Sequence, residues 1–446
     1  MKKIILLFFT CNLLLYATTI KEAWDFLKSN DNALKAKNIE QKIAKLKQKS
    51  AKSMYLPSIS LTGSYSYLDE PVKIAKDSLS LNLGKLGTIP LPTHDIALSE
   101  QNILMANVNL VWPLYTGGKI DAAQDIYKAK TKEAKILTEI KKDKKFLKLI
   151  KYYYGVVVSK SLFNTRKEAY KALSLHYENA KKLMQNGQIA NVELLNAKVK
   201  LDAAKIELTK AKNKFLIAQS ALKTLIKKDI EPTSSLFVKN KIKKSQSSFK
   251  TEMEQNYSGL EIFDVKDMQA KAFEDIKKAA WYPEVVGFAN YNLYKDNSIL
   301  SQSLPTWFGG VMVKIDILKR SDRNQEIQIA KMMNQKVNRL RLDALESLHL
   351  LLEKTYKELM ASKEEYNSLT SSIDLANENY KLRTIAFKEG LTTSVELVEA
   401  QTFLESVKTK RLNAAYLYLQ KLALLCVLSG ERNRFFEFVE EKDINK

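Results

Sequence analysis

The 446-residue sequence has few residues that break or cross-link a chain: 13 glycines, 8 prolines and 2 cysteines. So little Gly and Pro argues against a loop-rich fold. With so few cysteines, of which only Cys426 lies beyond the N-terminal segment, we expect neither an intrachain disulfide nor a thiolate metal cluster. No stretch reaches about 18 uninterrupted apolar residues after the N-terminus, so we predict no transmembrane helix.

The N-terminus has the pattern of a secretory signal peptide, which we assign to residues 1–17. Two lysines precede a short apolar stretch, and Ala17 offers a small residue for cleavage before Thr18. The stretch is too short to span a membrane. Cys11 lies inside it in a poor context for lipidation, so we expect no lipid anchor. The alternative is an apolar N-terminal helix of a cytosolic protein.

The formal net charge of +22 would suit nucleic acid or another anionic surface. The lysines, however, are spread along every predicted helical segment and are not gathered in one arm. A lysine-rich solvated surface is therefore the preferred interpretation. Export makes a nucleic-acid partner less plausible still.

Nothing in the sequence indicates catalysis. His94, His176 and His349 are isolated and have no ligand or triad spacing around them, so we expect each to be a satisfied or exposed histidine. The sequence has no P-loop, no Gly-rich dinucleotide motif and no zinc-protease motif. We therefore predict no enzyme activity, no metal and no cofactor, and any energy for transport must come from a partner.

Two segments with almost no helix breakers are far longer than an ordinary helix. Lys119–Asn186 contains one breaker, Gly155, and Ser321–Glu389 contains neither Gly nor Pro. Each would extend roughly 100 Å as a helix. Shorter uninterrupted segments follow at Gln188–Glu231 and Leu391–Ser429. Since helices of globular proteins usually have roughly 8 to 20 residues, we predict coiled-coil-type helices.

The segment that follows residue 188 carries a heptad pattern. Its apolar residues keep a 3-4 spacing without a break: Leu194, Ala197, Leu201, Ala204, Leu208, Ala211, Phe215, Ala218, Leu222 and Leu225. Large and small residues alternate, so a facing helix can approach closely at each alanine. A similar pattern starts at Leu397, Ala400 and Leu404 and resumes at Leu412, Ala415, Leu419 and Leu422 after a one-residue slip.

Four segments between the helices alternate with a period of two. Apolar or Gly residues occupy one face of Ser58–Tyr67, and a second set comprises Leu104, Ala106, Val108, Leu110 and Trp112. The third set comprises Val285, Ala289, Tyr291 and Leu293, and the fourth Val311, Val313, Ile315 and Ile317. Segments of this kind flanked by aromatic residues are typical of transmembrane β-strands. The flanking aromatic residues are Tyr55, Trp112, Tyr115, Trp281, Tyr282, Trp307 and Phe308.

The sequence contains an internal repeat. Gly187–Ala197 aligns with Gly390–Ala400 at an offset of 203, and Tyr177 matches Tyr380 at the same offset. Each half is predicted to hold a helix, two strands and a long helical hairpin. The predicted parts are a first repeat at 18–227, a linking segment at 228–259, a second repeat at 260–430 and a tail at 431–446.

The repeated glycines mark the tips of the two hairpins. Gly187 and Gly390 can each adopt the left-handed conformation that ends a helix. Asn191 and Ser394 are the predicted N-caps of the two return helices.

Four strands cannot close a barrel, and an open sheet edge in lipid leaves backbone groups unsatisfied. Bacterial outer-membrane barrels need about eight strands or more. The chain must therefore assemble with copies of itself, and three copies supply twelve strands. The first strand-connecting loop, Asp69 to Gln101, is the longer of the two.

Over almost its whole mature length the chain resembles the TolC-like outer-membrane efflux family. The resemblance is carried by Val111–Ile120, which contains Pro-Leu-Tyr-Thr-Gly-Gly, by the two glycine tips and by the order of elements. It implies a homotrimer with a twelve-stranded β-barrel in the outer membrane of a Gram-negative bacterium. A long α-helical barrel would extend into the periplasm, with residues 228–259 in an equatorial region. The implied partners are outer-membrane lipid, a periplasmic adaptor and an inner-membrane transporter, for drug efflux or type I secretion.

The resemblance also implies a gate at the tips. Glu396 and Glu399 match positions where family members line the periplasmic entrance with acidic residues, and such a ring would favour cations. Family members close the aperture with a tyrosine hydroxyl and an Arg–Asp bond, at positions that correspond here to Phe387, Thr392 and Asn191. None of these can form the same links, and Arg383 is a candidate substitute cation. The alternative role of Glu396 is an ordinary residue at a helix start.

Two other functions remain open from the sequence. An exported coiled-coil structural or adhesive protein would explain the helices but not the four strands. A periplasmic adaptor would contain one helical hairpin and a compact β-rich body, not a duplicated plan of long helices.

Overall fold

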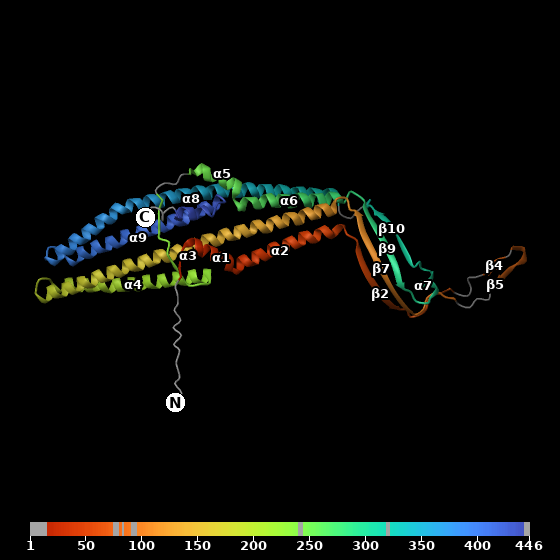
Figure 1. Ribbon diagram of the computed structural model, residues 1–446, viewed down its shortest axis with the longest axis horizontal. Helices are drawn as coiled ribbons and strands as arrows, with labels where there is room; N and C mark the ends of the chain where they lie inside the picture. The colour runs from red at the N-terminus through yellow and green to blue at the C-terminus, as the bar shows by residue number, and fades with distance from the viewer. Residues whose placement is uncertain are drawn as a thin grey trace, which may run out of the picture. The chain divides into compact units, whose positions relative to one another are not determined.

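The computed structural model describes residues 16–74, 80–82, 84–90, 96–239, 244–317 and 322–440 (Figure 1). Most of the predicted signal peptide, together with Cys11 and His94, lies outside the described residues. The chain divides into two compact units, which are described separately. The first comprises residues 1–42, 133–264 and 339–446, and the second comprises residues 43–132 and 265–338.

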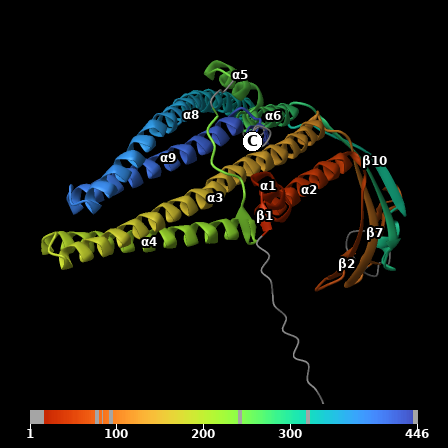
Figure 2. The same ribbon diagram turned by 60° about the vertical axis from the view of Figure 1, so that its left-hand side comes forward.

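Helices make up most of the chain, and the two longest confirm the prediction from the breaker-free segments. α3 spans Lys119–Gln185 and α8 spans Arg323–Lys388, with 67 and 66 residues. Each reverses at a tight turn into a return helix, α4 (Asn191–Ile226) and α9 (Ser394–Leu428). Within the first unit the two hairpins lie side by side (Figures 1 and 2). The fold is therefore mainly α with a small β part, as predicted.

The predicted heptad pattern of α4 is confirmed by its burial. All ten residues of the pattern are buried or partly buried, whereas apolar residues between them, such as Val199 and Ile206, are exposed. Phe215 stacks on Phe163 of α3 with the ring centroids 6.2 Å apart. The pattern therefore faces the long helix of its own hairpin, as heptad positions do in coiled coils.

The main core of the first unit surrounds the middle of the long helices. Shorter helices elsewhere in the chain are α1 (Ile20–Asn30), α2 (Asn32–Lys52), α5 (Gln246–Asn256), α6 (Ser258–Ala279) and α10 (Arg434–Glu440). Of these, α1 and α10 supply rings to this core. Phe146 of α3 meets Trp24 of α1 and Phe435 of α10 edge-on, with centroids 5.3 and 5.8 Å apart. All three rings are completely or almost completely buried. Burial of each such ring stabilises the fold by roughly 1.5–3 kcal/mol.

A short parallel ladder beside this core joins the two ends of the first half. β1 (Tyr16–Thr18) pairs with β8 (Ile230–Pro232). The Tyr153 hydroxyl donates to the Thr18 carbonyl at 2.7 Å and accepts from the backbone N–H groups of Thr233 and Ser234. The predicted signal cleavage after Ala17 falls within β1 and stays a prediction. It would leave Thr18 and its contact with Tyr153 in the mature chain.

The second unit contains a four-stranded antiparallel sheet in the order β10-β9-β7-β2. Its strands are β2 (Ser58–Tyr67), β7 (Asn102–Tyr115), β9 (Glu284–Tyr294) and β10 (Trp307–Lys314). All four predicted strands are therefore present. One detail was wrong: β10 ends at Lys314, so Ile315 and Ile317 lie outside the strand.

The strand register gathers the apolar residues on one face of the sheet. Leu61 lies opposite Val108, Leu110 opposite Ala289, and Ala289 opposite Gly309. Because side chains alternate along each strand, the other face carries Ser, Thr and Asn residues of β2, β7 and β9, together with Phe288, Phe308 and Met312 toward β10. On that face the Asn109 amide donates to the Thr62 hydroxyl at 3.2 Å and accepts from the Asn290 amide at 2.6 Å.

Short elements fill the two connections between the strands. The first contains β3 (Lys73–Ile74), β4 (Ser80–Asn82), η3 (Gly84–Leu86), β5 (Thr88–Pro90) and β6 (Ile96–Ala97), and η1 (Ser53–Tyr55) precedes β2. The second contains α7 (Ile299–Ser303). The Leu300 N–H donates to the Leu98 carbonyl at 2.8 Å, which ties the two connections together. No helix in the described part of the chain is long and apolar enough to cross a membrane.

Candidate gate at the two hairpin tips

Both hairpins turn by the same backbone device. Gly187 and Gly390 have φ values of 71° and 70°, in the left-handed region that favours glycine. The Gly187 N–H donates to the Met184 carbonyl and the next N–H to the Leu183 carbonyl, and equivalent bonds occur at Gly390. This is the Schellman pattern that ends a helix. Both long helices therefore end in a turn at a glycine, Gly187 in the first hairpin and Gly390 in the second.

The return helices begin one residue earlier than predicted. The N-cap of α9 is Thr393, not Ser394, and the N-cap of α4 is Ala190, not Asn191. The Thr393 hydroxyl accepts from the Glu396 N–H, and the Glu396 carboxylate accepts from the Thr393 N–H, which is a capping box. The sequence suggested Ser394 because both residues are good N-caps. The methyl group of Ala190 cannot accept a hydrogen bond, so the first tip lacks this cap.

Glu396 also binds the end of α8. The Arg383 guanidinium donates to the Glu396 carboxylate at 3.2 Å and to the Thr392 hydroxyl at 3.3 Å, and that hydroxyl donates to the same carboxylate. The hydrogen bond from Thr392 lowers the pKa of Glu396 below its ordinary value. The structure thus brings together three of the six predicted gate residues. All these bonds lie within the second hairpin.

The other predicted gate residues occupy different environments. Phe387 is buried, and its ring meets the His176 ring edge-on with centroids 4.4 Å apart. Asn191 and Glu399 are exposed. Of these three residues, therefore, Phe387 serves the packing of the tips within one chain, and Glu399 and Asn191 are left pointing to solvent.

Two residues that sequence reasoning missed connect the hairpins. The Nε2 atom of His176 on α3 lies 2.6 Å from the hydroxyl oxygen of Ser394, which is completely buried. The Ser394 N–H donates to the Glu193 carboxylate of α4 at 3.1 Å. Burial lowers the pKa of His176 to about 4, so the ring is neutral at pH 7. Glu193 could have been found, since it aligns with Glu396 in the repeat; His176 has no such sequence signal.

Apolar packing surrounds these polar links. Ala180 and Ala197 of the first hairpin pack with Phe387 and Leu397 of the second. Farther along the hairpins, the Arg166 guanidinium of α3 bonds the Glu405 carboxylate of α9. The two tips therefore form one packed body within a single chain.

The predicted interface aromatics lie at the ends of the strands in the second unit. Trp112, Tyr115, Trp281, Tyr282 and Trp307 are all exposed by 45% or more. The Trp112 indole donates to the Tyr55 carbonyl at 3.0 Å. Large exposed aromatics with a hydrogen-bonding edge suit the border between membrane and water.

The Pro-Leu-Tyr-Thr-Gly-Gly stretch has both glycines in the left-handed region, and the first also lies at a close approach. Gly117 and Gly118 have φ values of 64° and 85° where β7 passes into α3. A Cβ atom at Gly117 would lie 2.7 Å from the Tyr282 Cβ and 2.9 Å from the Ala279 carbonyl oxygen. No other residue type fits this junction without a shift of the backbone of the second half.

Solved structures of outer-membrane channels share this fold. The CmeC outer membrane channel of Campylobacter jejuni has a TM-score of 0.75 at 17% identity, over 93% of this chain and 86% of that one. VceC of Vibrio cholerae has a TM-score of 0.73 at 14% identity, over 93% and 96%. The MtrE outer membrane channel of Neisseria gonorrhoeae has a TM-score of 0.71 at 14% identity, over 93% and 89%. At these identities the likeness concerns the fold.

A family profile gives the relationship in sequence. Among curated protein sequences, none matches the chain. The profile of the family described as Outer membrane efflux protein matches residues 25–226 and 264–431, which is most of the chain. The TolC-like resemblance seen in the sequence is thereby confirmed, and the chain belongs to the outer membrane efflux protein family.

Proposed function

We propose that the chain is one of three identical subunits of a passive exit duct in the outer membrane of a Gram-negative bacterium. The observation that carries the proposal is the four-stranded sheet with one apolar face and two free edges, β2 and β10. Both edges carry backbone groups that the sheet itself leaves unpaired. In lipid these groups need partners, and pairing of β2 with β10 of a neighbouring copy supplies them.

Three copies joined in this way form a closed barrel of twelve strands. The apolar face then meets lipid and the polar face lines the lumen, as in other outer-membrane barrels. The hydrogen-bonded side chains of Thr62, Asn109 and Asn290 would face the transported solute. The recurring order of strands and long hairpins in the two halves supports an arrangement close to six-fold symmetry.

The long hairpins would extend the duct into the periplasm, with the region around residues 228–259 as an equatorial belt. Opening would take place at the tips, through contact with a periplasmic adaptor and an inner-membrane transporter that supplies the energy. The family membership and the fold shared with solved outer-membrane channels support these partners. The duct itself would not act as an enzyme.

Within the proposed gate we assign different roles to the two glutamates. Glu396 is held by its own helix start and by Arg383. Glu399 is exposed one turn farther along α9, so it is the better candidate for an acidic ring at the entrance. A ring of carboxylates in a constriction favours cations.

Conductance in planar lipid bilayers tests the proposal. The purified protein should migrate as a heat-sensitive trimer and form a cation-selective pore. Glu399→Gln should reduce cation selectivity more than Glu396→Gln does. A water-soluble rod without conductance would contradict the duct and favour an exported coiled-coil structural protein. A pore whose selectivity ignores both substitutions would contradict only the acidic ring.

A further inference from the structure

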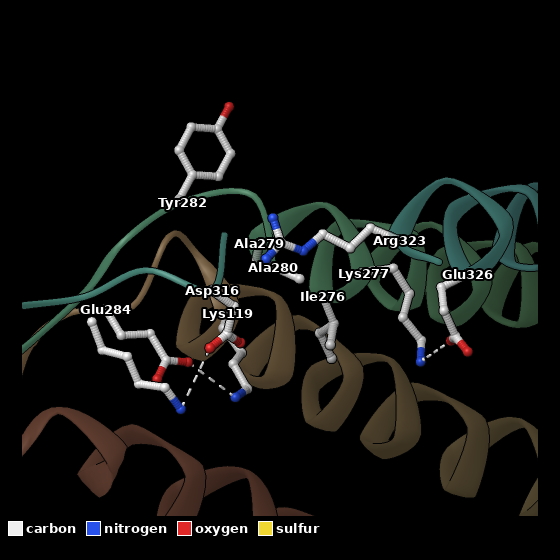
Figure 3. A pocket seen from close by; sticks show the side chains of 11 residues that line it. Lys119, Ile276, Lys277, Ala279, Ala280, Tyr282, Glu284, Asp316, Arg323 and Glu326 are labelled. Atoms are coloured by element: carbon white, nitrogen blue, oxygen red, sulfur yellow. Dashed lines mark hydrogen bonds and ion pairs between the residues drawn. The ribbon is translucent and has the colours of Figure 1, made fainter. Parts of the chain in front are cut away.

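The second unit contains a charged cavity of about 290 Å³ where β9 and β10 meet the ends of α3, α6 and α8 (Figure 3). Ile276 and Ala279 of α6, with Ala280 directly after the helix, supply its apolar wall. Ligand pockets start at roughly 300 Å³. The space therefore suits a small polar group with a short apolar attachment better than a bare ion.

Three ion pairs neutralise most of the charge around the cavity. Lys119 lies 3.3 Å from the Glu284 carboxylate. Lys314 lies 3.7 Å from the Asp316 carboxylate. Lys277 lies 2.6 Å from the Glu326 carboxylate. Each of the three carboxylates that line the cavity thus already has a lysine as its partner.

Arg323 is the fourth cation that lines the cavity, and its guanidinium lies between two of these pairs in Figure 3. Its guanidinium carbon is 5.0 Å from the centroid of the Trp281 ring, a cation–π distance. The Nη2 atom is buried and has no hydrogen-bond partner in the described part of the chain. A buried charged donor without an acceptor is costly, and an anion would remove that cost.

We propose that this cavity binds a phosphate group, with the Arg323 guanidinium as its principal ligand. The planar guanidinium offers two parallel N–H donors, a geometry that matches phosphate oxygens. Trp281 restrains the side chain before the ligand arrives. The exposed Trp281 and Tyr282 are typical of a membrane interface, where phospholipid phosphates lie. The same chemistry would also accept a soluble phosphate monoester.

Two probes distinguish these sources of phosphate. Native mass spectrometry of the delipidated full-length protein should show retention of added phosphatidylglycerol, and a thermal shift should report binding of glycerol phosphate. Arg323→Gln should weaken binding of whichever probe binds by at least about tenfold, since a neutral amide cannot replace the two charge-assisted hydrogen bonds of the guanidinium. Arg339→Gln is the matched control, because Arg339 lies on the same helix and is exposed.

A second variant should act in the opposite direction. Glu326→Gln releases Lys277 from its ion pair, so phosphate binding should strengthen by several fold. This holds even if Arg323→Gln fails to fold. Retention of lipid alone identifies a head-group site, and a shift with glycerol phosphate alone identifies a soluble ligand. The proposal is overturned if neither probe binds, if Arg323→Gln binds as the unmodified protein does, or if Glu326→Gln weakens binding.

Discussion

The two hairpin tips of this chain have the same turn but different helix starts. Gly187 and Gly390 end their helices with the same hydrogen bonds. These bonds join backbone atoms only, so they do not depend on the side chains that differ between the two tips. At the first tip the N-cap of α4 is Ala190, which gives no side-chain cap, and Glu193 of α4 bonds across to the second hairpin. At the second tip Glu396 completes a capping box of its own helix.

This difference shows that equivalent residues of a duplicated segment can take different roles. The second tip is self-contained, and the first depends on the second for the partner of its glutamate. Ser394 is the joint, since it bonds both Glu193 and His176 of the first hairpin. The equivalent residue, Asn191, is exposed.

Acidification should have the largest effect on the link between the tips. The pKa of His176 is lowered to about 4 in the folded chain, from 6.5 for an ordinary histidine. As pH falls from 6.5 to 4 the unfolded chain binds the proton first, so folding stability is lost over that range, by about 3 kcal/mol between pH 7 and pH 4. Unfolding midpoints measured across this range, for the unmodified protein and for His176→Asn, should diverge in their acid dependence.

Asparagine is the substitution of choice because Asn379 stands at the position equivalent to His176 in the second half. His349→Asn is the control, since His349 pairs with Glu254 at a partly exposed site. Parallel curves for the unmodified protein and for His176→Asn would contradict the assigned role.

Substitution of Ser394 should lower the stability of the protein, whereas the same substitution at the equivalent Asn191 should not. Ser394→Leu overfills a buried site and removes the hydroxyl that bonds His176, while the backbone N–H that bonds Glu193 is kept, and this should destabilise the protein by about 2 kcal/mol. Asn191→Leu, at the equivalent exposed position, should change stability by less than about 0.5 kcal/mol. Chemical unfolding in detergent measures both. Equal effects would mean that the two tips are equivalent in the assembled protein.

Removal of the cap of α9 should destabilise the protein, and addition of a cap to α4 should stabilise it. Thr393→Ala should cost about 1 kcal/mol, because it removes the capping box of α9. Ala190→Ser should stabilise α4 by a similar or smaller amount, since a serine hydroxyl can accept from the Glu193 N–H. Thermal unfolding of the two single variants and of the double variant checks this. Destabilisation by Ala190→Ser would show that the first tip requires an uncapped start.

The exposed ion pair of the second tip should matter least for stability. Arg383 and Glu396 are both nearly half exposed, and such pairs contribute roughly 0–1 kcal/mol. Arg383→Gln should therefore shift the unfolding midpoint no more than Lys381→Gln, which breaks the neighbouring exposed pair with Glu378. A much larger loss for Arg383→Gln would place this pair in an interface between subunits.

Much of the fold could be predicted from local patterns. The long helices followed from the absence of breakers, and the strands followed from alternation. The error at β10 has a simple cause: Ile315 and Ile317 continue the alternation, but the ladder with β9 ends when Lys314 reaches Glu284, the first residue of that strand. Periodicity detects a face and does not detect where the partner strand stops.

The site was harder to predict. Glu396, Thr392 and Arg383 could be named because the resemblance to the TolC-like family implies a gate at the tips, and they lie within a few residues of one tip. His176 and Ser394 are 218 residues apart in sequence, and no local pattern indicates that the two side chains meet. The exposed aspect of Glu399 and the burial of Phe387 also depend on how the second hairpin packs against the first.

The sequence by itself determined where helices run, where they turn and which strand face is apolar, because these depend on residues that are close in the chain. Only the tertiary structure decided which polar groups meet across the hairpins. It also decided that one guanidinium nitrogen of Arg323 has no hydrogen-bond partner among the described residues, at a junction of five elements. The physical reason is that hydrogen bonds and ion pairs act over a few ångströms, and packing alone sets which distant residues come that close.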